Sequence, residues 1–282
     1  MTGVSSPTAF QHGRAYGVTP DVSGGPFGFP DASNTGVPAG ATLTPLSGEQ
    51  HITTPDAVID GVELTGFFLV DAPNVTIRNS RVISDNTDAV YIDDGASLLI
   101  EDCEIVIPST KGYGGISPSN YTARRLNIHG GEGHFWVMNN VVIEDCYSHD
   151  PMAYDPETDP HVDNIQLNEP NPPGANNAVI DHNSILGSYD ASSCLQMKGG
   201  TNIAITNNKF SGAGYSLRMA FSDGSTDLVV TGNRFSNEVP AHAGHPEQYA
   251  FYAAVDEGVE FATTWDDNKY LNGPNAGEDV AE

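Results

Sequence analysis

Residues 203–210 read Ile203-Ala204-Ile205-Thr206-Asn207-Asn208-Lys209-Phe210, and this order of residue types decides the fold. Apolar residues alternate, two or three polar residues follow, and another apolar residue closes the segment. The same order recurs at 75–82, 98–105, 141–146, 178–185 and 228–235, with weaker copies at 121–128 and 265–270. The copies are roughly 20–25 residues apart, apart from one wider gap before residue 180, and that is the length of one turn of a β-solenoid.

The repeat predicts that equivalent residues of successive copies lie directly above one another, because parallel strands stack at about 4.8 Å. Apolar residues then form an inner column of Ile77, Ile100, Ala123, Ile143, Ile180, Ile205 and Val230. A column of asparagines follows at the next turn, as an amide ladder requires, with the members Asn183, Asn208, Asn233 and Asn268.

A second strand segment follows each copy and alternates with a period of two residues. Its members lie at 89–92, 115–117, 135–137, 164–167, 194–197, 216–219 and 250–253. We therefore expect an all-β fold, a single-stranded right-handed parallel β-helix (solenoid) of about 8–9 rungs.

The chain divides into four predicted regions. Residues 1–30 lack periodicity and are rich in glycine and proline, which predicts an extended N-terminal arm. Residues 31–57 are expected to cap the open end of the helix, since a bare terminal rung exposes strand edges. Residues 58–272 form the β-helix itself, and 273–282 form an acidic C-terminal tail, expected to be mobile.

Composition excludes several classes of protein. The formal charge of −26 repels phosphate backbones and anionic membrane surfaces, so we expect no nucleic-acid partner. No apolar run approaches the roughly 20 residues of a membrane span, and the first residues do not resemble a signal peptide. Cys103, Cys146 and Cys194 lack the spacing of a zinc site, and we expect no intrachain disulfide between them.

The stacked repeats resemble the pectate-lyase-like superfamily of right-handed parallel β-helices. Residues 29–40, Phe29-Pro30-Asp31-Ala32-Ser33-Asn34-Thr35-Gly36-Val37-Pro38-Ala39-Gly40, look like the lead-in of β-helix proteins from actinobacteria and their phages. Residues 161–166 and 198–203 look like their core, although Asn164 stands where the family more often has glycine. The resemblance implies a tailspike, fibre or decoration protein, or an enzyme acting on polysaccharide, and it implies a homo-oligomer such as a trimer.

Alternation within the second strand segments predicts an exposed stripe of side chains along the helix. Its members are Tyr91, Ser117, Trp136, Gln166, Gln196, Arg218 and Tyr252, with Lys198 beside them. Amides and cationic groups bind sugar hydroxyls and carboxylates, and aromatic rings stack on sugar faces. The stripe predicts a carbohydrate-binding surface, and a polar sheet face without a ligand is the alternative.

The sequence also contains candidate catalytic and metal-binding residues near this stripe. His161, Asp163 and Arg218 are the candidates for proton transfer or charge neutralisation, and a structural role at the corner of the rung is the alternative. No metal or cofactor is required by the sequence. Clustered oxygens at Asp150, Asp155, Glu157 and Asp159 are a candidate Ca²⁺ site, with an acidic solvated loop as the alternative.

Two functional classes and a third alternative follow. The first is a phage virion surface protein, a tail or head appendage, that binds cell-envelope polysaccharide and docks to other virion proteins through its N-terminal arm. The second is a polysaccharide lyase or glycoside hydrolase acting on an acidic glycan, either on the virion or extracellular. The third is a purely structural decoration protein.

Overall fold

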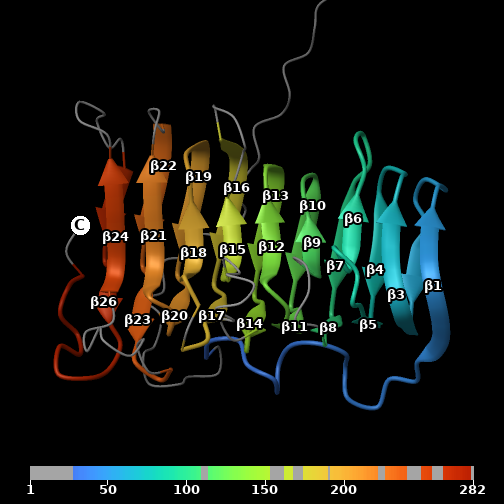
Figure 1. Ribbon diagram of the computed structural model, residues 1–282, viewed down its shortest axis with the longest axis horizontal. Coiled ribbons are helices and arrows are strands. Elements are labelled where there is room, and N and C mark those ends of the chain that lie inside the picture. Colours follow the sequence, from blue (N-terminus) through green and yellow to red (C-terminus); the bar gives the residue numbers. More distant parts are fainter. Residues whose placement is uncertain are drawn as a thin grey trace, which may run out of the picture.

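The structure, a computed structural model, describes residues 28–108, 114–152, 162–167, 174–189, 191–221, 226–239, 249–255 and 263–280. These residues form a long solenoid of parallel strands whose rungs follow one another along a single axis (Figure 1). No helix in the described ranges is long and apolar enough to cross a membrane.

One face of the solenoid is a nine-stranded parallel sheet. Its strands are β2 (Val58–Asp60), β4 (Val75–Arg78), β7 (Leu98–Glu101), β10 (Tyr121–Arg124), β13 (Asn139–Glu144), β16 (Ala175–Asp181), β19 (Gly200–Thr206), β22 (Thr226–Thr231) and β25 (Thr263–Asp266). We call it the nine-stranded sheet.

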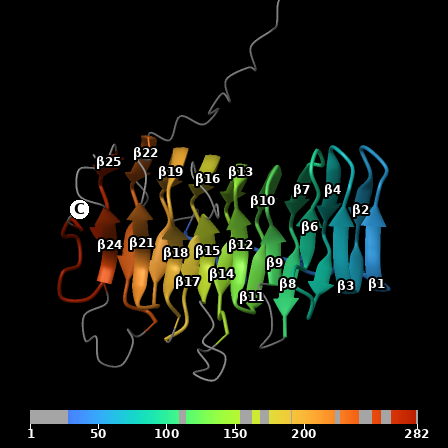
Figure 2. The same cartoon turned by 45° about the horizontal axis from the view of Figure 1, so that its top comes forward.

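The other strands belong to a 17-stranded sheet that consists of two stacks. The β5–β26 stack contains β5 (Arg81–Ile83), β8 (Glu104–Ile107), β11 (Asn127–Gly130), β14 (Tyr147–His149), β17 (Ser184–Leu186), β20 (Lys209–Ser211), β23 (Arg234–Ser236) and β26 (Lys269–Tyr270). The β6–β24 stack contains β6 (Val90–Ile92), β9 (Gly114–Ser117), β12 (Gly133–Val137), β15 (Asp163–Leu167), β18 (Ser193–Met197), β21 (Tyr215–Phe221) and β24 (Tyr249–Val255). The long strands β1 (Thr44–Ile52) and β3 (Val62–Val70) join the two stacks, since β3 pairs with both β5 and β6. The turned view in Figure 2 shows the stacks side by side.

The register confirms the predicted inner column. Ile77 pairs with Ile100, and the pairing continues through Ala123, Ile143, Ile180 and Ile205 to Val230. All seven of these side chains are fully buried. Because the sequence repeat is one rung long, residues of the same type stack on one another along the core.

The asparagine ladder is also present. Asn183 Nδ2 donates to Asn208 Oδ1 at 3.0 Å, Asn208 Nδ2 to Asn233 Oδ1 at 3.1 Å, and Asn233 Nδ2 to Asn268 Oδ1 at 2.9 Å. Each amide also bonds to backbone, as Asn208 Nδ2 does to the carbonyl of Ile180 at 2.8 Å. The ladder therefore stabilises the sharp turn between the nine-stranded sheet and the β5–β26 stack.

The three cysteines are free and buried, which confirms the prediction of no disulfide. Leu126 occupies the rung between Cys103 and Cys146 at this turn. Burial raises the pKa of the thiols of Cys103 and Cys194 to about 12. The cysteines therefore serve as small apolar residues of the core.

The N-terminal boundary of the helix lies earlier than predicted. β1 pairs residue by residue with β3, from Thr44 with Val62 to Ile52 with Val70, so residues assigned to the cap already form a rung. The preceding segment does not close the open end. Residues 28–43, here called the strap, run along the outside of the β5–β26 stack (blue in Figure 1). Residues 1–27 of the predicted arm lie outside the described residues.

Contacts at both ends fix the course of the strap. The ring of Phe29 stacks on His182 with 6.0 Å between centroids, and Lys209 Nζ lies 5.9 Å from the same ring. Further along, the N–H of Gly36 donates to the carbonyl of Arg125 at 2.8 Å. The strap thus crosses several rungs before it enters β1.

The C-terminal tail packs on the last rung instead of being mobile. Val280 is buried, its N–H donates to the carbonyl of Asn268 at 2.7 Å, and Trp265 Nε1 donates to the carbonyl of Val280 at 2.9 Å. A short antiparallel bridge joins Lys269 to Asp279. The tail therefore covers a strand edge that a solenoid must protect.

Candidate functional site

The predicted stripe is a single column on the outer side of the β6–β24 stack. Trp136 pairs with Gln166, Gln166 with Gln196, Gln196 with Arg218, and Arg218 with Tyr252. Near the other end of the stack Tyr91 pairs with Ser117. The residues preceding them in sequence, such as Ile165, Leu195 and Leu217, are fully buried in the core, so alternation sends the stripe to the opposite side.

Exposure along the column differs from the prediction. Gln166 and Gln196 are only 5% and 2% exposed, whereas Tyr91 is 38% exposed. Trp136 and Arg218 are partly buried, Lys198 is exposed, and the side chain of Tyr252 lies outside the described part. Each glutamine has a neighbour about 4.8 Å away on either side of the column, which shields a short amide. The two glutamines therefore do not form an open surface.

Burial makes the polar atoms of this column chemically significant. No hydrogen-bond donor among the described residues reaches Gln196 Oε1, although the atom is buried. A buried acceptor without a donor costs about 1–3 kcal/mol, and such atoms commonly face a water or a ligand. One rung further, the guanidinium of Arg218 lies 5.8 Å from the ring centroid of Tyr215. An acceptor and a cation thus lie next to each other in the column.

Two of the three predicted catalytic residues, Asp163 and Arg218, lie in the described part of the chain. Asp163 is fully buried and accepts a hydrogen bond from Ser193 Oγ. Asp163 pairs with Ser193 and Ser193 with Tyr215, whose ring lies 5.8 Å from the Arg218 guanidinium. The catalytic role of Asp163 and Arg218 stays a prediction. His161 lies outside the described residues.

Asn164 belongs to a buried polar cluster that the sequence analysis missed. Its Nδ2 donates to Ser148 Oγ at 3.0 Å and to the carbonyl of Leu186 at 3.1 Å. Ser148 Oγ is also 2.7 Å from His134 Nδ1. Burial lowers the pKa of His134 to about 3, so the imidazole is neutral. The cluster joins the β5–β26 stack to strands β12 and β15, which positions Trp136 and Gln166.

Asp88 is a second residue that the sequence analysis missed. Ser117 Oγ donates to its Oδ1 at 2.8 Å, and Ser117 belongs to the column between Tyr91 and Trp136. Burial raises the pKa of the Asp88 carboxyl, and the Ser117 hydrogen bond opposes this only in part. The only signal in the sequence is its position in the turn just before β6. A carboxyl with a raised pKa is a common component of functional sites.

Replacing Asp88 with asparagine should stabilise the protein near neutral pH. A folded-state pKa above the unfolded value means that the contribution of Asp88 to stability is complete below the ordinary value of 3.8 and is lost as pH rises through the folded pKa. Asp88→Asn stays neutral, so its melting temperature should exceed that of the wild type at pH 7, and the gain should disappear at low pH. Asp85→Asn, at an exposed carboxyl, is the control. A gain that persists at low pH would contradict the assignment.

The calcium prediction concerns mainly residues that the structure does not describe. Asp155, Glu157 and Asp159 lie outside the described ranges. Asp150 is exposed, and its Oδ2 is 2.8 Å from His149 Nδ1. Within the described ranges, no group of three or more His, Cys, Asp or Glu side chains is arranged to hold a metal ion. Calcium binding at this loop stays a prediction.

Comparison with known proteins identifies a matching protein family and a similar solved structure. The family model for the right-handed beta helix region matches residues 58–154. The fold is a right-handed parallel β-helix. The crystal structure of the Dettilon tailspike protein (gp208) is similar to this β-helix, with 12% sequence identity and a TM-score of 0.36. The similarity covers 81% of this chain and 62% of the tailspike chain, so this chain spans less than two thirds of the tailspike's length. No curated protein sequence matches the chain significantly.

Proposed function

We propose that this β-helix is a phage virion surface protein that binds cell-envelope polysaccharide along the outer side of the β6–β24 stack. The observation that carries the proposal is the column of Trp136, Gln166, Gln196 and Arg218, in which the two glutamines are buried and Gln196 Oε1 has no donor among the described residues. A sugar hydroxyl supplies such a donor. The resemblance of residues 29–40 to the lead-in of phage β-helix proteins supports a location on the virion surface, attached to other virion proteins through residues 1–27.

The chemistry of the column favours an acidic glycan over a neutral one. Trp136 offers an aromatic face for a sugar ring, and the guanidinium of Arg218 offers charged hydrogen bonds for a carboxylate. Lys198 directly follows the end of β18, two residues after Gln196. It is exposed and adds a second positive charge. Rungs about 5 Å apart are comparable in spacing to the units of a linear glycan, so successive sugars meet successive side chains.

Trp136→Ala should weaken polysaccharide binding by about 1–3 kcal/mol, which is the usual cost of removing an aromatic anchor from a binding site. Arg218→Ala should weaken binding most for acidic glycans, and its effect should shrink at high salt. Isothermal titration with a panel of bacterial envelope polysaccharides measures both effects.

Arg81→Ala is the matched control, because Arg81 pairs with Glu63 and Glu104 on the β5–β26 stack, away from the column. Equal losses in the control and in Arg218→Ala would contradict the assignment of the column. Release of oligosaccharides during the same incubation would indicate a lyase or hydrolase. Absence of binding to every glycan would favour a purely structural decoration protein. A position of the coding gene among capsid and tail genes would support the virion assignment.

A further inference from the structure

The outer side of the nine-stranded sheet carries a column of uncharged side chains along the whole solenoid. One residue from each strand contributes, and the register aligns them as Val58, Thr76, Leu99, Thr122, Val142, Val179, Ala204, Val229 and Thr264. We call this the uncharged column. Val58 is 57% exposed, and the other members are partly buried or exposed. Nine successive rungs without a charge are unexpected on the solvent side of a chain with a formal charge of −26.

A column of amides flanks the uncharged column on the side where the strands begin. Asn140 Nδ2 donates to Asn120 Oδ1 at 2.9 Å, Asn177 Nδ2 to Asn140 Oδ1 at 3.2 Å, and Asn202 Nδ2 to Asn177 Oδ1 at 2.7 Å. Each amide has two N–H donors and two acceptor positions, and the column uses one of each. Each amide within the column therefore has one N–H donor and one acceptor position left that another molecule can bind.

Charged residues flank the uncharged column on the opposite side, where the strands end. They are Asp60, Arg78, Glu101, Arg124, Glu144, Asp181 and Asp266, with two threonines between the last two. Ion pairs neutralise much of this charge, because Arg78 pairs with Asp60 at 2.8 Å and Arg124 pairs with Glu144. Five carboxylates and two arginines leave this column with a net charge of −3.

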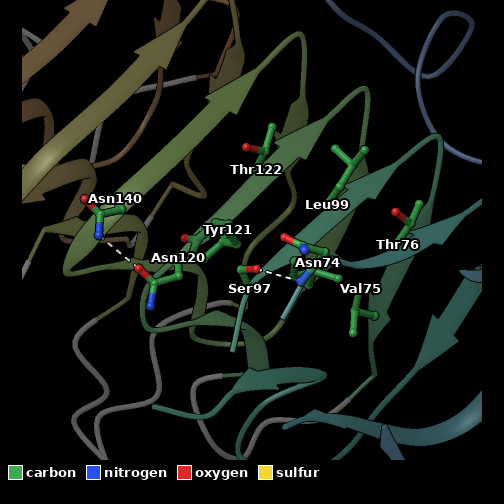
Figure 3. Close-up of a pocket in the computed structure, with 10 residues that line it drawn as sticks. Asn74, Val75, Thr76, Ser97, Leu99, Asn120, Tyr121, Thr122 and Asn140 are labelled. Atoms are coloured by element: carbon green, nitrogen blue, oxygen red, sulfur yellow. Dashed lines mark hydrogen bonds between the residues drawn. The ribbon is translucent and has the colours of Figure 1, made fainter. Parts of the chain in front are cut away.

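Strands β4, β7 and β10 also form a shallow groove of about 440 Å³ on this face. It lies between the amide column and the uncharged column, and Figure 3 shows Asn74, Asn120, Asn140, Thr76, Leu99 and Thr122 around it. None of the ten lining residues is charged. The groove thus suits a long side chain that brings hydrogen-bond donors to the amides.

We propose that a second copy of this chain packs on the nine-stranded sheet, with the two solenoids parallel and related by a two-fold axis along the uncharged column. In this arrangement each residue of the uncharged column faces the same residue of the other copy. The amide column of one copy faces the charged column of the other, on both sides of the axis. Two-fold interfaces are self-complementary in this way.

In this dimer the groove of one copy and two arginines of the other copy lie at the same rungs. Arg78 and Arg124 of one copy lie opposite Asn74 and Asn120 of the other, because they stand two residues after the uncharged column and the asparagines two residues before it. A guanidinium has five N–H donors, so it can keep its carboxylate partner and still donate to an amide oxygen. The parallel arrangement therefore gives the amide oxygens of Asn74 and Asn120 a donor from the other copy.

The size of the face also fits a dimer better than a glycan. Nine strands at about 4.8 Å and three columns at about 7 Å give roughly 900 Å² per copy, close to the typical contribution of one partner to a stable interface. None of the described residues in the three columns is aromatic, whereas aromatic rings are the usual anchors for sugars. On the two-fold axis itself only uncharged side chains of the two copies meet, so like charges do not face each other there.

Sedimentation equilibrium of the full chain over a wide concentration range tests the dimer. The wild type should dimerise, and Val142→Glu should weaken dimerisation at least about a hundredfold, because it places two carboxylates against each other on the axis. Val106→Glu is the matched control, at a partly buried outward valine of β8 in the other sheet, and it should dimerise like the wild type. Thermal melting checks that both variants fold.

Complementary charges test the parallel arrangement. Leu99→Glu and Leu99→Lys should each be monomeric, and an equimolar mixture should form a heterodimer, since Leu99 faces Leu99 only when the solenoids are parallel. Antiparallel solenoids would bring Leu99 opposite Ala204 and give no rescue, which would overturn the arrangement. A monomeric wild type at all concentrations, a trimer, or a dimer that Val142→Glu leaves intact would overturn the interface. A monomer whose binding to a neutral glycan is lost in Val142→Glu would assign the face to a glycan instead.

Discussion

Asn208→Ala should lower the free energy of unfolding by about 3–4 kcal/mol. The Asn208 amide is fully buried, accepts from the backbone N–H of Asn183 at 3.0 Å and donates to the carbonyl of Ile180 at 2.8 Å. Removing it leaves both backbone groups without these partners in a site that water cannot reach, and each loss costs about 1–3 kcal/mol. Chemical denaturation monitored by circular dichroism measures the change.

Asn176→Ala serves as the control for the ladder, because Asn176 is a partly buried asparagine on β16 outside the ladder. It should change stability much less. Equal effects of the two substitutions would show that the loss in Asn208→Ala arises from strand propensity and not from the buried hydrogen bonds. Asn208→Asp should be at least as harmful as Asn208→Ala, since it replaces a buried donor with an acceptor or a charge.

Gly115→Ala should destabilise the protein by at least about 3 kcal/mol, at the upper end of what overpacking costs. A Cβ on Gly115 would overlap the backbone carbonyl of His134 in the next rung. Strand β9 pairs with β12 on both sides of this point, through Gly114 with Gly133 and Ile116 with Phe135. Relief therefore requires separation of two paired strands, which breaks their hydrogen bonds.

Gly214→Ala is the matched control, because a Cβ there would be 3.2 Å and 3.6 Å from its nearest neighbours. Thermal unfolding should show a small change for Gly214→Ala and a large one for Gly115→Ala. A folded Gly115→Ala variant should also show altered tryptophan emission, since Trp136 is on the strand that must move. Similar melting temperatures for the two variants would contradict the close approach of β9 and β12.

The sequence predicted the core and the ladder because both depend on a repeat. A period of one rung fixes which residues lie above one another, so the column from Ile77 to Val230 and the asparagines from Asn183 to Asn268 could be aligned without coordinates.

Other features of the site depend on contacts that the sequence repeat does not predict. Alternation gives the side to which Gln166 and Gln196 point, but burial depends on what surrounds them. The bond between Ser117 and Asp88 joins a strand to a turn one rung away, and the strap follows no repeat. Irregular segments pack according to shape and individual hydrogen bonds, which a pattern search does not detect.

The strap determines where the protein bears mechanical load. In a solenoid without such a segment, tension on the N-terminal end would peel away the first strand, which has only one neighbour. Here tension first meets the stacking of Phe29 on His182 and then the hydrogen bond from Gly36 to Arg125, before it reaches β1. These contacts lie at different rungs along the axis and are loaded one after the other. A β-helix held by its N-terminal residues is therefore pulled from its side, against its middle rungs, and the end rung is loaded last.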